Sequence, residues 1–81
     1  VDPFGGVIKD GWIWGRGTLD MKGIGVMHLT ALITLKQQGI VPPRDIVMLS
    51  TPDEETGGER GIQWMIANHW SELNPEYVLD E

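Results

Sequence analysis

The sequence contains no cysteine, and it has half as many basic as acidic residues. Without cysteine, a disulfide framework and a thiolate metal site are both excluded. Six lysines and arginines against twelve aspartates and glutamates give a net charge of −6. This charge argues against a nucleic-acid partner, because binding to phosphates needs a basic face. No apolar run approaches the length that spans a bilayer, so no membrane partner is expected either.

The length of the chain limits the number of domains, and its charge indicates what kind of ligand it could bind. A chain of 81 residues forms at most one small domain and buries a limited core. The excess of carboxylates suits a cation-binding site, although acidic proteins are also common for reasons of solubility. The chain starts at Val1 without an initiator methionine and ends at Glu81 directly after an apolar run. These two features predict that residues 1–81 are a segment of a longer polypeptide.

An acidic run stands where a strand is expected to end. Three adjacent carboxylates, those of Asp53, Glu54 and Glu55, follow the apolar run Asp45–Ser50 and precede two glycines. The apolar run predicts a buried strand, and a helix is predicted after the glycines. In open α/β sheets, ligands bind beyond the carboxyl ends of the strands. The acidic run is therefore a candidate site, whereas the same three residues alone would more simply indicate a solvated loop.

The remaining elements follow from turn signals and apolar spacing. The pair Asp10-Gly11 between β-prone residues predicts a hairpin, and apolar residues at helical spacing predict two helices. Gly39 is the expected C-cap of the first helix. The expected ranges are a hairpin at 6–14, a helix at 21–38, a strand at 44–51, a helix at 59–73 and a strand at 77–79. Strands that alternate with helices predict an α/β fold, with a β-hairpin followed by α-β-α-β and a mostly parallel sheet with covering helices.

This predicted sheet would bring several acids together. Asp20, the acidic run and the pair Asp80-Glu81 each follow a predicted strand, and the carboxyl ends of parallel strands share one edge. Carboxylates gathered at such an edge suit one divalent cation or two bridged cations. The histidines, His28 and His69, lie on apolar helix faces, where a hydrogen-bonded packing role is expected instead of metal ligation.

The sequence resembles the M20 zinc metallopeptidases, which include aminoacylases, acetylornithine deacetylase, succinyl-diaminopimelate desuccinylase and related carboxypeptidases. The resemblance covers nearly the whole chain, and its two central motifs are specific at this separation. The closing stretch Tyr77–Glu81 looks like the aminoacylase and carboxypeptidase S branch. The motifs that carry the resemblance are Asp2-Pro3-Phe4-Gly5-Gly6, Asp10-Gly11, Gly15-Arg16-Gly17-Thr18-Leu19-Asp20-Met21-Lys22-Gly23, and Asp53-Glu54-Glu55 with Gly57-Gly58.

The resemblance implies a role for each matching acid. It makes Asp20 the carboxylate that bridges two Zn²⁺ ions, with Co²⁺ as a possible substitute, and Glu54 the general base. Glu55 would bind one zinc and Glu81 the other, and the peptide bond between Asp20 and Met21 would be cis. Two zinc ions about 3.5–4 Å apart need a bridging ligand and terminal ligands. The implied reaction is cleavage of an amide or peptide bond, in N-acyl amino acids or small peptides, by a metal-bound water.

Some parts that the resemblance implies are not in the sequence. A His-x-Asp motif, a second histidine ligand and a lid domain used for homodimer formation all lie outside residues 1–81. The chain is thus expected to be a partial catalytic domain with about half of a site, and to be inactive by itself. Two other functions remain open at this point: a non-catalytic interaction module, and a magnesium-dependent phosphoryl-transfer domain, for which no phosphate-binding turn is visible.

Overall fold

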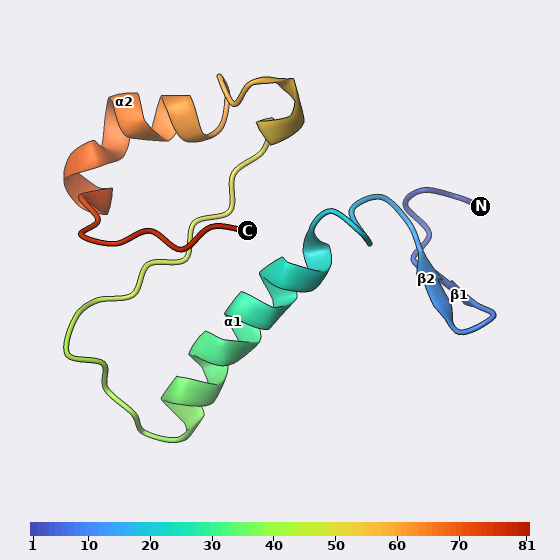
Figure 1. Ribbon diagram of the computed structural model, residues 1–81, viewed down its shortest axis with the longest axis horizontal. Helices are drawn as coiled ribbons and strands as arrows, with labels where there is room; N and C mark the ends of the chain where they lie inside the picture. Colours follow the sequence, from blue (N-terminus) through green and yellow to red (C-terminus); the bar gives the residue numbers. More distant parts are fainter. The chain divides into compact units, whose positions relative to one another are not determined.

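The computed structural model describes residues 1–81 and divides the chain into two compact units, Val1–Pro43 and Arg44–Glu81. The first unit contains a hairpin and a long helix, and the second contains a short 3₁₀ helix and a second α-helix (Figure 1). The elements, in chain order, are β1 (Val7–Lys9), β2 (Trp12–Trp14), α1 (Lys22–Gln37), η1 (Glu54–Thr56) and α2 (Ile62–Leu73).

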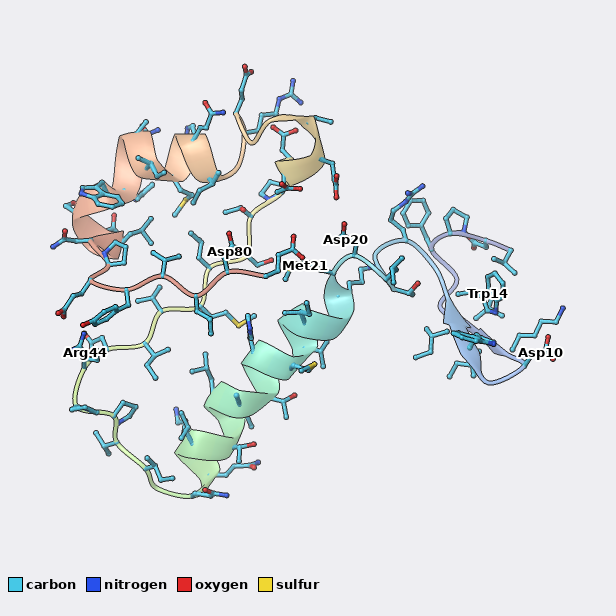
Figure 2. The ribbon with its side chains drawn as sticks, in the orientation of Figure 1. Asp10, Trp14, Asp20, Met21, Arg44 and Asp80 are labelled. Atoms are coloured by element: carbon cyan, nitrogen blue, oxygen red, sulfur yellow. The ribbon has the colours of Figure 1, made fainter.

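The predicted hairpin is confirmed. Strands β1 and β2 pair in antiparallel register, with Ile8 opposite Ile13. The turn between them consists of Asp10 and Gly11, whose φ angles are +53° and +79°. Positive φ at both central residues defines the two-residue turn that matches the twist of the strands, and glycine adopts it without steric cost. The Trp14 indole N–H donates to the Lys9 carbonyl oxygen at 3.4 Å across the hairpin (Figure 2).

The first helix also follows the prediction, within one residue at each end. Helix α1 ends in a Schellman motif, in which the Ile40 N–H donates to the Leu35 carbonyl and the Gly39 N–H to the Lys36 carbonyl. Gly39 has φ +68°, the left-handed conformation that this motif requires at the residue after the C-cap. The glycine at this position therefore stops the helix, as the sequence indicates.

The second helix is shorter than expected, because the segment before it forms turns. Helix α2 starts at Ile62 instead of near residue 59, and it ends at Leu73 as predicted. His69 has non-helical backbone angles (φ −132°, ψ 19°), so the helix is kinked at this residue. Its Nδ1 lies 2.6 Å from Glu72 Oε1, which gives His69 the hydrogen bond expected of it. The His28 side chain, by contrast, makes no hydrogen bond.

The predicted parallel sheet is wrong. The only sheet is the antiparallel pair β1–β2, and the segments at 44–51 and 77–79 are not strands. Neither segment makes a backbone hydrogen bond with another part of the chain. A strand is defined by ladder hydrogen bonds to a neighbour, whereas an apolar, β-prone run supplies only a preference for such pairing. The α-β-α-β order with covering helices is therefore replaced by one hairpin, two α-helices and long irregular segments.

Within the second unit, the segments at 44–51 and 77–79 are connected near their first residues by side-chain contacts instead of backbone hydrogen bonds. Arg44 Nη1 lies 2.6 Å from Glu76 Oε2, and the Arg44 guanidinium lies 5.2 Å from the centre of the Tyr77 ring (Figure 2). The two charged side chains are 56% and 69% exposed. An exposed ion pair of this kind contributes only about 0–1 kcal/mol, so it does not replace the missing ladder.

Apolar side chains remain largely exposed throughout the structure. No hydrophobic residue is fully buried, and Trp12, Trp64 and Trp70 are 69%, 50% and 49% exposed. Hydrophobic burial is the dominant favourable term in folding, and here little of it is realised. Neither α-helix combines the length and the hydropathy needed to cross a bilayer.

We expect residues 1–81 expressed alone to be poorly stable as a monomer, because so little apolar surface is removed from water. The isolated chain should aggregate, form oligomers or bind hydrophobic dyes such as ANS. Size-exclusion chromatography with light scattering, dye fluorescence and thermal unfolding followed by circular dichroism test this. A sharp, cooperative melt of a monomer at low concentration would contradict the expectation.

Candidate metal centre

Asp20 lies in the turns that lead into α1. The Thr18 hydroxyl donates to the Gly15 carbonyl at 2.9 Å, and the Lys22 N–H donates to the Gly17 carbonyl at 2.8 Å. These bonds fold the segment back just before the helix and leave Asp20 at its start (Figure 2). The Asp20 carboxylate is exposed and has no hydrogen-bond or ion-pair partner, so its oxygens are available to a ligand.

The peptide bond between Asp20 and Met21 is cis. The resemblance to the M20 metallopeptidases implies a cis bond at this position, so this expectation is confirmed.

The acidic run forms a closed loop, which we call the acidic loop (residues 53–61). Its first part is the 3₁₀ helix η1, and the Asp53 carbonyl accepts bonds from the Thr56 N–H at 3.2 Å and the Gly58 N–H at 2.7 Å. Asp53 itself has φ +74°, a left-handed conformation that aspartate tolerates better than most residues. The acidic run is therefore held in a specific turn.

The Asp53 side chain closes the acidic loop from inside. Its carboxylate accepts hydrogen bonds from the Thr56 hydroxyl and, at 3.0 Å, from the Arg60 backbone N–H. The Thr56 bond, and next the Arg60 bond, hold the pKa of the Asp53 carboxyl below its ordinary value, because both stabilise the charged form. Sequence reasoning grouped Asp53 with the other acids. Aspartate is common in turns because its side chain bonds to nearby groups of the same loop, and this tendency is the signal that could have separated Asp53.

Two glycines allow the acidic loop to pack tightly. Gly58 and Gly61 are buried, and Gly58 has φ +75°. A Cβ atom on Gly61 would approach the Pro52 carbonyl oxygen more closely than real Cβ atoms do, and would lie 3.2 Å from the Pro52 carbonyl carbon and from Thr51 Cβ. The loop thus returns to the residue at which it began, an approach that only glycine permits. The sequence pattern alone did not distinguish Gly61 from the other glycines of the chain.

Glu54 and Glu55 are presented outward by η1. A 3₁₀ helix has about three residues per turn, so neighbouring side chains are roughly 120° apart around its axis. Both residues are exposed, and the Glu54 carboxylate has no hydrogen-bond or ion-pair partner. The two glutamates therefore leave the loop in different directions, which fits two different roles.

Glu81 lies at the end of an irregular segment in the second unit. Its backbone N–H donates to the Asp80 carboxylate at 3.0 Å, and its side chain is exposed. The sheet edge that was expected to bring Glu81 and the acidic loop together does not form. No three metal-binding side chains are grouped in the structure. The ligand roles of Asp20, Glu55 and Glu81 and the base role of Glu54 therefore stay predictions.

The donor set is chemically compatible with zinc, although it is incomplete. Carboxylate oxygens are zinc ligands at about 2.0–2.2 Å, but zinc sites in enzymes also take histidine nitrogen or cysteine sulfur. Asp20 offers a free carboxylate, and neither histidine joins a group of ligands. The residues present fit part of a zinc site, with Asp20, Glu55 and Glu81 as the carboxylates that would hold the metal.

Comparison with known proteins assigns the chain to a family. The model of peptidase family M20/M25/M40 matches residues 1–81. Aminoacylase-1 of Sus scrofa is 40% identical over 82 residues, which cover 99% of this chain and 20% of that protein. A probable carboxypeptidase S-like protein of Dictyostelium discoideum is 42% identical over 82 residues, covering 98% of this chain and 16% of that protein. No solved structure matches.

A bacterial relative extends the comparison. Succinyl-diaminopimelate desuccinylase of Cereibacter sphaeroides is 42% identical over 71 residues, which cover 82% of this chain and 18% of that protein. The chain thus spans about a fifth of the length of the curated relatives that it matches. Because the family model matches along its whole length, the chain belongs to peptidase family M20/M25/M40, whose members are generally metal-dependent hydrolases.

Proposed function

We propose that residues 1–81 are part of the catalytic domain of a di-zinc hydrolase that cleaves the amide bond of N-acyl amino acids or small peptides. The match to the family over residues 1–81 carries this proposal. The 40% identity to a protein named aminoacylase-1 supports N-acyl amino acids as the substrate class. The family match also argues against the magnesium-dependent phosphoryl-transfer domain that the acids alone left open.

The four acids take separate roles in this proposal. Asp20 would bridge two metal ions, while Glu55 would bind one of them and Glu81 the other. Bound zinc supplies Lewis-acid polarisation of the amide carbonyl and lowers the pKa of a water molecule to about 7. Three carboxylates also neutralise much of the charge of two divalent ions. The exposed, unpaired Asp20 carboxylate is consistent with such a role.

Glu54 would move the proton. Its carboxylate accepts a proton from the attacking water while the water oxygen bonds to the carbonyl carbon. It then donates that proton to the amide nitrogen as the carbon–nitrogen bond breaks, which releases a carboxylic acid and an amine. A base of this kind needs an unpaired carboxylate within hydrogen-bond reach of the water. Glu54 has an exposed carboxylate without a partner, which supports this choice over Asp53.

The proposal is tested with the full-length protein that contains these residues. We expect it to hydrolyse N-acetyl amino acids, to lose activity on dialysis against a chelator, and to regain activity with Zn²⁺ or Co²⁺ but not Mg²⁺. Metal content measured by atomic absorption should approach two zinc ions per chain. Activity that survives complete removal of metal, or recovery with magnesium alone, would contradict the proposal.

The isolated chain is expected to bind zinc weakly. Its predicted ligands are carboxylates only, whereas zinc prefers sites that include nitrogen or sulfur, and no three potential ligands are grouped in its structure. Isothermal titration calorimetry of residues 1–81 with zinc measures the affinity and the stoichiometry. Tight binding of two ions per chain would show that these residues form a complete site by themselves.

A further inference from the structure

Asp53 differs from the neighbouring Glu54 in what its side chain does. The Asp53 carboxylate is occupied by two donors, the Thr56 hydroxyl and the Arg60 N–H. The Glu54 carboxylate has no partner. These two adjacent acids of the same loop therefore serve different purposes, and Asp53 holds the loop together.

The two bonds span the segment that presents the glutamates, because Asp53 precedes that segment and both donors follow it. Thr56 is the last residue of η1, and Arg60 lies beyond the glycine pair that follows it. Oδ2 of Asp53 accepts from Arg60 and Oδ1 from Thr56. Since each oxygen has its own donor, a side chain with a single acceptor oxygen, such as asparagine, cannot accept both bonds in this arrangement, and it loses the negative charge that strengthens them. Bonds to a charged carboxylate are also about twice as strong as those between neutral groups.

The loop closed in this way is fixed to helix α2. The Gln63 side-chain amide donates to the Gly57 carbonyl at 2.6 Å, and the Gln63 backbone N–H donates to the Gly58 carbonyl at 3.0 Å. Gln63 is the second residue of α2. Hydrogen bonds thus run from Asp53 through the glycines to the helix, so the direction of Glu54 and Glu55 is set relative to α2.

We propose that Asp53 is a positioning residue, which acts through the Thr56 and Arg60 bonds to orient Glu54 and Glu55 and neither binds metal nor transfers a proton. This inference rests on the proposed function, because it presumes that Glu54 is the base and Glu55 a ligand. It adds that the hydroxyl of Thr56 contributes to kcat although it touches neither metal nor substrate. Displacement of a reacting group by about 1 Å can reduce a rate by up to 10²-fold.

The test uses four variants of the full-length protein. Asp53→Asn removes one acceptor oxygen, Thr56→Val removes the hydroxyl at constant shape, and Thr56→Ser restores it. Thr34→Val is the matched control, because the Thr34 hydroxyl also donates to a backbone carbonyl, that of Thr30 at 2.8 Å, but within α1. Each variant is measured for kcat and KM at saturating zinc, for zinc content, and for hydrogen exchange of residues 53–61 in the metal-free protein.

Asp53→Asn and Thr56→Val are expected to lower kcat about tenfold or more, with KM and zinc content nearly unchanged and with faster exchange in residues 53–61. Thr56→Ser should restore kcat, and Thr34→Val should alter neither kcat nor exchange in the loop. The inference is overturned if Thr56→Val exchanges faster but keeps its kcat. It is equally overturned if Asp53→Asn loses zinc and excess zinc restores its activity, since Asp53 would then be a ligand.

Failure of the proposed function gives a different result. In that case the unmodified protein shows no zinc-dependent hydrolysis, or Glu54→Gln keeps full activity. Either outcome would contradict the proposed role of Glu54 as the base, and with it the proposed role of Asp53 in positioning Glu54. Faster exchange in Asp53→Asn would then report only on the stability of the loop.

Discussion

Replacement of Glu54 by glutamine is expected to lower kcat of the full-length protein by about 10²–10⁴-fold, the range typical of general acid–base catalysis, while both zinc ions stay bound. Glutamine keeps the size and the hydrogen-bonding capacity of glutamate but has no carboxylate to accept a proton. The Glu54 side chain has no structural partner to lose, so the fold should be unaffected. Stopped assays of N-acetyl amino acid hydrolysis and metal analysis of the same preparation measure the two quantities.

Glu55→Gln is the matched comparison, because it makes the same chemical change one residue away. Glu55 leaves η1 in a different direction from Glu54, and its proposed role is to bind one zinc. The Glu55→Gln variant should therefore contain less metal, and its activity should recover partly as zinc is added. If Glu54→Gln loses metal while Glu55→Gln keeps it, the two roles are reversed.

Replacement of Gly61 by alanine is expected to destabilise the full-length protein by about 1–3 kcal/mol, the usual cost of inserting a group where no space exists. The new Cβ would meet the backbone of Pro52, and backbone atoms cannot move aside as the end of a flexible side chain can. The acidic loop would have to open, so kcat should fall as well. Urea unfolding and steady-state kinetics of the variant measure both effects.

Gly23→Ala is the control for this prediction. Gly23 lies in α1, and a Cβ atom there meets nothing within 4 Å. Alanine is a better helix former than glycine by about 1 kcal/mol, so stability should be unchanged or slightly higher. If Gly61→Ala were as stable and active as Gly23→Ala, the close approach of Gly61 to Pro52 would not exist in solution.

Local structure could be predicted where a few neighbouring residues decide it. The hairpin turn depends on Asp10 and Gly11, which adopt positive φ at low cost. The end of α1 depends on Gly39, whose N–H satisfies a carbonyl of the last turn. In both cases the partners of each hydrogen bond lie within a few residues of one another. The local sequence therefore contains every group that forms these two turns.

The organisation of the acidic loop was only partly predictable. The order of strand, acids and glycines suggested a loop that presents carboxylates, but it did not distinguish Asp53 from Glu54. The distinction depends on which carboxylate meets the Thr56 hydroxyl and the Arg60 N–H. Those contacts follow from the left-handed backbone of Asp53 and from the fit of Gly61 against Pro52, neither of which shows in composition or spacing.

The sequence by itself determined the family, through motifs distributed over residues 1–81, together with the hairpin, the extent of α1 and the C-terminal end of α2. Only the tertiary structure decided that the apolar runs at 44–51 and 77–79 form no strands here and that Asp53 bonds inward while Glu54 stays free. The physical reason is the same for both. Turns and helices satisfy their hydrogen bonds locally, whereas a strand, or a carboxylate that closes a loop, needs partners that the local sequence does not specify.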